Sequence, residues 1–399
     1  MTTPTKADEI PAVCLEAETL MAEAKQQSGL SDFGDYHFRE GLDRLLEALN
    51  GEARLNAFGR FYAHGELLRH LTNRLRVTED WKRHPEIGAE RIRAPLFVVS
   101  LPRSGSTILH LLLVQDPDAR FPATWECNLP SPPAERASYD TDPRIAQWED
   151  HIANTLGRFV PEFKKMHPMA ARFPEECNVL NGYELTSQVF SYQFHIPSYE
   201  SWYERIDLRF VYETHRRQLQ YMQWHCPAVR WVLKAVNHLW ALDHIFEVYP
   251  DAMVVQTHRD PLAVIASLTS LLSAGYRMVS DHIDSNVIAR EWSDSWARAL
   301  RKVMDFRASG RVNPARILDV RYAEFMQDPI AMIGRIYGHF GLTFSAEAER
   351  RMRQFLAENP QGKHGEHRYN LRQFGLDPAL ERERYRFYTE HYGVQPDAR

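Results

Sequence analysis

The stretch PLFVVSLPRSGST at residues 95–107 decides the fold class. Pro95–Leu101 is a short apolar run with β-branched residues, which is typical of a strand buried on both faces of a sheet. A tight polar loop, Pro102–Thr107, follows this strand. The apolar segment Ile108–Gln115 then predicts a helix. A buried strand, a short polar loop and a helix in this order predict the first unit of an α/β sheet.

The polar loop is a candidate phosphate-binding site, formed by Arg103, Ser104, Gly105, Ser106 and Thr107. The first N–H groups of a helix lack partners within the helix, and the helix dipole favours negative charge beside them. Gly105 lets the backbone come close to an anion, and Arg103 offers a guanidinium that can donate two parallel hydrogen bonds. The three hydroxyl groups add further donors. The alternative is a turn that only caps its helix.

The loop is not a Walker A motif, which requires the pattern G-x-x-x-x-G-K-[ST]. Ser100 stands where the first glycine of that motif would be, and Ser106 stands where the lysine would be. The lysine is missing and no clear acidic partner for magnesium is visible. The sequence therefore disfavours an enzyme that hydrolyses a magnesium-bound nucleoside triphosphate.

Further strands alternate with helices along the chain. The patterns predict strands at 230–234, 252–258 and 316–320 with helices between them, and hence a mostly parallel sheet. Arg259 lies directly after the second of these strands, at the edge where ligands bind in open α/β sheets. Ser267 follows two helical turns later, and we expect it to face the same groove.

Two segments outside the alternating pattern are expected to be helical. Residues 1–90 show apolar residues at three- and four-residue spacing and predict a helical N-terminal cap, with a purely structural appendage as the alternative. Residues 91–399 then form the α/β domain. Within it, 118–228 reads as a mostly helical insertion on the substrate side, and its aromatic stretch 190–202 suggests a pocket wall or, equally, a packing layer.

Composition and charge narrow the function classes. The 399 residues are 44% hydrophobic, and the formal net charge is -5, which disfavours a nucleic-acid-binding protein. The four cysteines, none of them in a CxxC pair, indicate neither a disulfide framework nor a zinc site. No signal peptide and no apolar run long enough to span a bilayer is evident, so we expect a cytoplasmic protein without an integral membrane segment. A peripheral contact with a membrane and a homo-oligomer both stay open.

Together these motifs resemble those of the sulfotransferase family. Its 5′-phosphosulfate loop has the pattern P-[KR]-S-G-[ST]-T after a strand, and Pro102–Thr107 matches it with arginine, as in the bacterial branch. Its 3′-phosphate motif is an arginine at a strand end with a serine two turns later, matched by Arg259 and Ser267. Lys234 stands at the end of an intervening strand, as in family members. The resemblance covers roughly residues 94–370.

Two further segments resemble nucleotide contacts of the family. Tyr322 in the sequence VRYAEF is similar to a tyrosine that contacts adenine in relatives. Lys363 and His364, with Arg368, are similar to a basic, glycine-containing loop that closes over the nucleotide. The resemblance implies a P-loop-like, mostly parallel sheet flanked by helices, with the N-terminal helices as an appendage.

The resemblance also implies the chemistry. The donor would be 3′-phosphoadenosine 5′-phosphosulfate, the product adenosine 3′,5′-bisphosphate, and no metal would be required. Arg103 and Lys234 would hold the sulfuryl oxygens and the leaving phosphate. The acceptor would be a hydroxyl of a small, apolar and possibly lipid-like molecule.

The general base stays open between two residues. Some branches use a glutamate shortly after the first helix, and Glu126 fits that placement. Eukaryotic cytosolic members use a histidine two positions after the lysine, whereas His238 lies further on from Lys234. The alternatives to a sulfotransferase are a small-molecule kinase on a P-loop-like fold and a nucleotide-binding protein without turnover.

Overall fold

The computed structural model describes residues 10–35, 37–156, 170–360 and 370–397. Five strands within these ranges form one sheet in the order β2-β3-β1-β4-β5, and every neighbouring pair is parallel. The strands are β1 (Leu96–Ser100), β2 (Ala119–Arg120), β3 (Arg230–Ala235), β4 (Met253–His258) and β5 (Ile317–Arg321). The parallel α/β fold is therefore confirmed. Only β2 was not expected, because two residues carry no recognisable strand pattern.

The central strand β1 has β3 on one side and β4 on the other. The register pairs Val98 with Lys234 and Ser100 with Thr257. The chain thus leaves the carboxyl end of β1 at the point where the strand order reverses, which is where ligands bind in open α/β sheets. The polar loop after β1 lies between Lys234, near the end of β3, and Arg259, just after β4.

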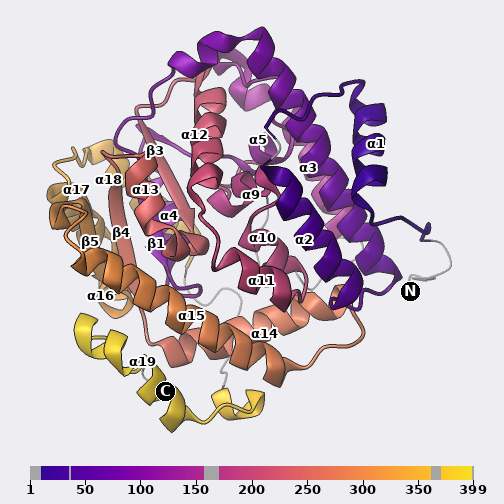
Figure 1. Cartoon of the computed structure of the whole chain (residues 1–399). Helices are drawn as coiled ribbons and strands as arrows, with labels where there is room; N and C mark the ends of the chain where they lie inside the picture. The colour runs from indigo at the N-terminus through magenta and orange to yellow at the C-terminus, as the bar shows by residue number, and fades with distance from the viewer. Residues whose placement is uncertain (1–9, 36, 157–169, 361–369, 398–399) are drawn as a thin grey trace.

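Helices cover both faces of the sheet (Figure 1). One face packs against α4 (Ser106–Leu113), α17 (Pro329–His339) and α18 (Ala346–Glu358). The other face packs against α12 (Arg209–Gln223), α13 (Leu242–Val248), α14 (Pro261–Val279), α15 (Ser285–Ala308) and α19 (Pro378–Tyr392). Side chains of β1 alternate between these layers, Val98 toward the first and Phe97 and Val99 toward the second. Burial on both faces explains the continuous apolar run in the sequence.

The N-terminal helices do not pack on the sheet. They are α1 (Ala17–Ser28), α2 (Phe38–Gly51) and α3 (Ala57–Arg83), and they share a separate hydrophobic cluster with α10 (Gln188–Gln193) and α11 (Pro197–Tyr203). Leu42 and Leu67 from the first group meet Phe190 and Ile196 from the second in this cluster. The N-terminal helices are therefore attached to the core mainly through the insertion.

The rest of the insertion begins with α5 (Thr124–Asn128), α6 (Pro143–His151) and α9 (Cys177–Asn181). Trp125, Ile145 and Trp148 form a small cluster of their own. Downstream of β3, the chain forms a 3₁₀ turn at Val236–Trp240 and then α13, because Ala241 leaves the helical region between them. The chain therefore turns sharply after β3, at the same edge of the sheet as the polar loop after β1.

Helix α14 has the length and apolar composition of a membrane span, which the sequence analysis did not anticipate. The mean hydropathy of an 18-residue stretch of this helix is 1.4, but most of that stretch is buried inside the fold. It packs between α3, α10 and α15. The apolar composition of α14 is thus that of a core helix.

Candidate active site

The loop after β1 is bent by two residues in the left-handed region of backbone space. Arg103 has φ 60° and Gly105, which precedes α4, has φ 81°. This conformation is uncommon for a residue other than glycine and gathers at functional loops. The buried Ser104 hydroxyl donates to the Leu101 carbonyl at 2.6 Å and lies 2.8 Å from Thr257 Oγ1. These bonds tie the loop to β4 and fix its backbone at the start of α4, where N–H groups lack helical partners.

Tyr322 packs directly against this loop. It is the first residue of α16 (Tyr322–Gln327), and a Cβ atom at position 105 would lie 2.8 Å from its Cδ2. Only glycine allows the two segments to come this close. The guanidinium of Arg259 lies over the same ring, with 4.2 Å between Cζ and the ring centroid. The loop, the ring and the guanidinium therefore form one continuous surface, with the aromatic and cationic groups that suit a purine nucleotide.

The two arginines predicted to bind phosphate meet at this surface. Arg103 Nε donates to Ser267 Oγ at 3.2 Å, and Arg259 Nη1 donates to the backbone carbonyl of Arg103. The other edge of the Arg259 guanidinium binds the carboxylate of Asp397. Nε and Nη2 of Arg259 lie 2.8 and 2.7 Å from Oδ2 of Asp397. The structure thus brings Arg103, Arg259, Ser267 and Tyr322 together.

Lys234 lies on the other side of the loop. Its side chain is 4% exposed, and its ammonium is 3.5 Å from Thr107 Oγ1. It also forms an ion pair with the carboxylate of Glu176, the residue that precedes α9. Glu176 retains 24% exposure, so this carboxylate is accessible while its lysine partner is buried. A cation beside the phosphate loop and a carboxylate on that cation are the two groups a group-transfer centre needs.

Sequence reasoning missed Glu176. The sequence offers one signal, the pair Glu175-Glu176 in a segment otherwise rich in apolar and aromatic residues. The two carboxyls differ in environment. The Glu175 carboxylate accepts a hydrogen bond from the Glu176 backbone N–H at 2.9 Å, and burial raises the pKa of Glu175 to about 7. Glu176 is the member of the pair that contacts Lys234.

Glu126, the first candidate for the general base, is fully engaged by the protein. Its side chain is 3% exposed and forms two bonds with Arg120, at 2.6 Å to Oε1 and 2.9 Å to Oε2. The Tyr139 hydroxyl donates to Oε2 at 2.7 Å. The carboxylate therefore has no oxygen turned toward a substrate, and the geometry favours a structural role.

We expect Glu126→Gln to destabilise the fold rather than to impair the chemistry. Breaking a buried ion pair on one side costs about 3–5 kcal/mol, because the remaining charge stays buried. The free energy of unfolding from denaturant titration measures this loss. The double variant Arg120→Met with Glu126→Leu should recover part of it, since no buried charge remains. A stable Glu126→Gln protein with a strongly reduced turnover number would contradict the structural assignment.

His238, the second candidate, is enclosed. It is 0% exposed, its Nδ1 lies 2.6 Å from the Tyr212 hydroxyl, and its ring meets the Phe97 ring edge-on. Burial holds the pKa of His238 well below its ordinary value, with smaller contributions from His215 and Lys234. The ring is thus neutral, and its Nε2 is a buried atom without a hydrogen-bond partner in the described part of the chain.

The predicted contacts Lys363, His364 and Arg368 lie outside the described residues. Within the described ranges, no group of three or more His, Cys, Asp or Glu side chains is arranged to hold a metal ion. The four cysteines are free thiols.

Comparison with known proteins agrees with this geometry. A family model described as "Sulfotransferase family" matches residues 95–346, which contain the phosphate loop, Lys234, Arg259 and Tyr322. The chain belongs to the sulfotransferase family. A solved sulfotransferase, STF1 from Mycobacterium tuberculosis H37Rv, is 34% identical, with a TM-score of 0.83 over 94% of this chain and 99% of its own. STF9 from Mycobacterium avium is 26% identical, with a TM-score of 0.85 over 97% and 99% of the two chains.

A curated relative is named for a specific activity. The omega-hydroxy-beta-dihydromenaquinone-9 sulfotransferase Stf3 of Mycobacterium bovis is 24% identical over 303 residues, which are 70% of this chain and 71% of the relative. The protein is therefore an enzyme of the sulfotransferase class.

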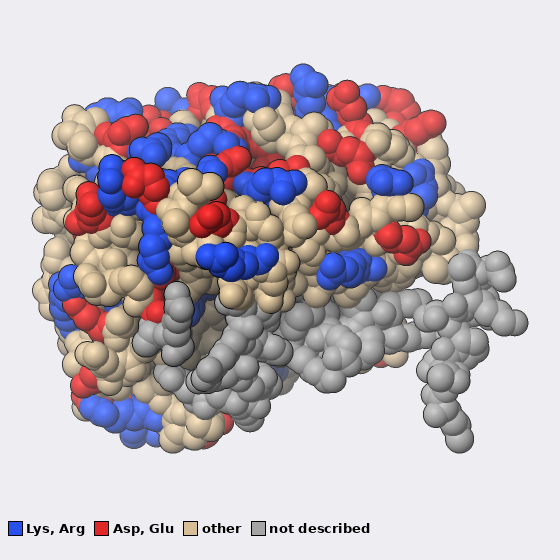
Figure 2. Space-filling model, turned by 90° about the horizontal axis from the view of Figure 1, so that it is seen from below, with Lys and Arg blue, Asp and Glu red and all other residues tan. Residues whose placement is uncertain are grey.

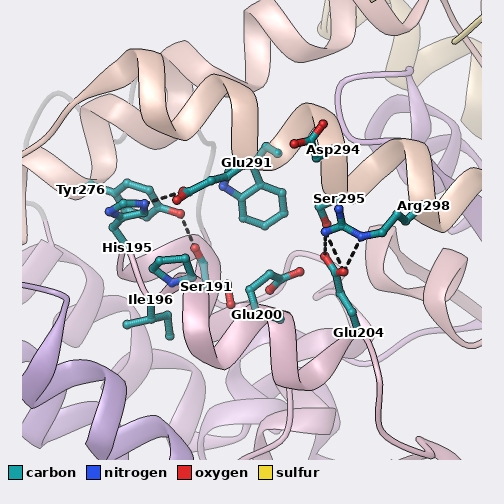
Figure 3. A pocket seen from close by; sticks show the side chains of 13 residues that line it. Ser191, His195, Ile196, Glu200, Glu204, Tyr276, Glu291, Asp294, Ser295 and Arg298 are labelled. Atoms are coloured by element: carbon teal, nitrogen blue, oxygen red, sulfur yellow. Dashed lines mark hydrogen bonds and ion pairs between the residues drawn. The ribbon is translucent and has the colours of Figure 1, made fainter. Parts of the chain in front are cut away.

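This sulfotransferase has a cavity between α10–α11 and α14–α15 (Figure 3). Its volume is about 210 Å³. Tyr276, Trp292 and Ile196 supply apolar surface. Glu200 also lines the cavity, and its carboxylate accepts a hydrogen bond from Gln188. Burial raises the pKa of Glu200 to about 7, so the cavity is less charged near neutral pH than its composition suggests.

Other acidic groups of the cavity are paired. Glu204 forms two bonds with Arg298, each 2.8 Å long, and Glu291 lies 2.7 Å from Nε2 of His195 (Figure 3). On the face of the enzyme shown in Figure 2, lysines and arginines alternate with acidic residues and do not gather in one basic region. That face of the sulfotransferase is thus unlike the basic surfaces that bind nucleic acids.

Proposed function

We propose that this sulfotransferase transfers a sulfuryl group from 3′-phosphoadenosine 5′-phosphosulfate to a hydroxyl of a small, apolar acceptor. The observation that carries the proposal is the convergence of Arg103, Arg259, Ser267 and Tyr322 on one groove at the carboxyl end of a parallel sheet. The phosphate loop and the Arg259 site are separate positive positions in that groove, as a doubly phosphorylated nucleoside requires.

The residues present fit such a donor. Arg259 already binds a carboxylate through its Nε and Nη2 edge, which is the edge an arginine offers to phosphate. We assign the 3′-phosphate to this position, with Ser267 beside it. The 5′-phosphate belongs to the N–H groups of the loop around Gly105, where the turn permits a close approach. Tyr322 offers a face for the base.

The bound donor supplies an activated sulfuryl group, whose bond to the phosphate oxygen breaks as the acceptor oxygen bonds to sulfur. Arg103 and Lys234 stabilise the negative charge that grows on the oxygens during this exchange. Glu176 accepts the proton of the acceptor hydroxyl, and its contact with Lys234 holds it at the centre of the reaction. No metal ion is needed to neutralise the charge when two cations line the site.

We place the body of the acceptor in the cavity between α10–α11 and α14–α15. Tyr192 adds a further aromatic ring beside this cavity, because it stacks on Trp292 with 5.2 Å between the ring centroids. The aromatic walls suit an apolar molecule. The relative Stf3, named for a hydroxylated menaquinone, is consistent with an apolar acceptor but does not identify the one used here.

Calorimetry with two nucleotides tests the proposal. Adenosine 3′,5′-bisphosphate is expected to bind without magnesium, whereas ATP with magnesium should bind far more weakly, because the Walker lysine is missing. A turnover assay with labelled phosphosulfate donor and a panel of small phenols follows. Tighter binding of magnesium ATP would favour a kinase, and binding of the bisphosphate without any turnover would favour a protein that only binds the nucleotide.

A further inference from the structure

The segment after α19 reaches into the nucleotide groove. Asp397 presents Oδ2 to both Nε and Nη2 of Arg259, at 2.8 and 2.7 Å. The side chains of this ion pair are 28% and 23% exposed, so the contact is half enclosed and not a loose surface pair. The carboxylate thus lies on the guanidinium edge that the proposed function assigns to the 3′-phosphate.

Several contacts hold this segment in place. The backbone N–H of Asp397 donates to Oδ2 of Asp260, the residue that follows Arg259, at 3.2 Å. Upstream, Tyr392 stacks on His258 with 4.0 Å between ring centroids, and the Tyr388 hydroxyl lies 3.0 Å from Nδ1 of that histidine. The path of the chain from α19 to the groove is therefore fixed at several points near the end of β4.

We propose that Asp397 is an internal competitor of the 3′-phosphate, so that the donor must displace this carboxylate from Arg259 before it binds. This proposal concerns the regulation of the site assigned above and rests on that function. Both anions need the same two N–H donors, and one guanidinium edge cannot serve both. The apparent dissociation constant is then the intrinsic one divided by the fraction of molecules in which Arg259 is released.

The expected effect is moderate. A pair that is about one-quarter exposed is partly screened by solvent, and exposed pairs contribute little. We expect removal of the Asp397 carboxylate to tighten binding of the bisphosphate to the protein by about three- to tenfold. The rate of transfer at low donor concentration should rise by a similar factor. The maximal rate should stay unchanged, because Asp397 does not contact Lys234 or Glu176.

Asp397→Asn in the full chain tests this directly. The probes are adenosine 3′,5′-bisphosphate and adenosine 5′-phosphate, which lacks the 3′-phosphate. Calorimetry should show tighter binding of the bisphosphate to the variant and unchanged binding of the monophosphate. Glu390→Gln, which removes one negative charge from the exposed face of α19, is the matched control and should change neither constant.

The binding results distinguish a failure of the competition by Asp397 from a failure of the proposed function. Equal affinities of the wild-type and variant proteins for the bisphosphate would overturn the competition while leaving the proposed function intact. An equal gain for both nucleotides would also overturn it, since the segment would then obstruct the whole groove and not the 3′-phosphate position. If the bisphosphate binds neither protein, the proposed function fails and the competition fails with it.

Discussion

Glu176→Gln is expected to slow sulfuryl transfer by about 10²–10⁴-fold, the usual contribution of a general base. Glutamine has nearly the same shape and can still contact Lys234, but it cannot accept the acceptor proton. The loss should appear in kcat, with the affinity for adenosine 3′,5′-bisphosphate unchanged. Single-turnover measurements at saturating donor would isolate the chemical step from product release.

Two controls sharpen this prediction. Glu175→Gln changes the neighbouring carboxyl, which does not contact Lys234, and should retain most of the activity. Acceptors of increasing acidity should lessen the defect of Glu176→Gln, because a phenol that ionises readily depends less on a base. A Glu176→Gln enzyme within threefold of the wild-type rate would rule out this carboxylate as the base and return attention to His238.

Arg103→Ala should lower kcat by about 10²–10³-fold, the typical cost of removing one preorganised donor for developing charge. The side chain is exposed and donates to Ser267, so its removal leaves the sheet and its cores intact. The bond from Arg259 to position 103 is made to the backbone carbonyl and survives the substitution. Rapid-quench assays would measure the rate, and thermal unfolding would confirm that the fold persists.

Arg103→Lys is the informative companion variant. It keeps the charge but loses the planar fork, so it should recover only part of the rate if two parallel hydrogen bonds matter. Full recovery would show that charge alone is sufficient. An alanine variant with near-normal turnover would remove Arg103 from the mechanism and would require Lys234 to stabilise the transition state alone.

The sheet, and the meeting of Arg103 with Arg259 at its edge, could be predicted from the sequence because both depend on local patterns. Buried strands such as β1 and β4 carry continuous apolar runs, and the loop around Gly105 follows its strand directly. Arg259 could be placed at the same edge because the carboxyl ends of parallel strands share it. These features need only the order of elements along the chain and not the details of packing.

The reaction centre could not be predicted in the same way, because its contacts join distant parts of the chain. Glu176 meets Lys234 across 58 positions, from a segment whose path has no local signature. Glu126 matched the position of a base, but its partner Arg120 lies on β2, a strand of two residues that no periodicity reveals. The contact of Asp397 with Arg259 likewise depends on where α19 leads the chain.

The hydrophobic cluster shared by the N-terminal helices and α10–α11 has a consequence for protein engineering. Ile196 belongs to that cluster and also lines the cavity, whereas the strands that carry the phosphate loop are anchored in other clusters. If the cavity binds the acceptor as proposed, libraries that vary residues around Ile196 would therefore change the acceptor preference and leave the clusters that anchor the phosphate loop intact.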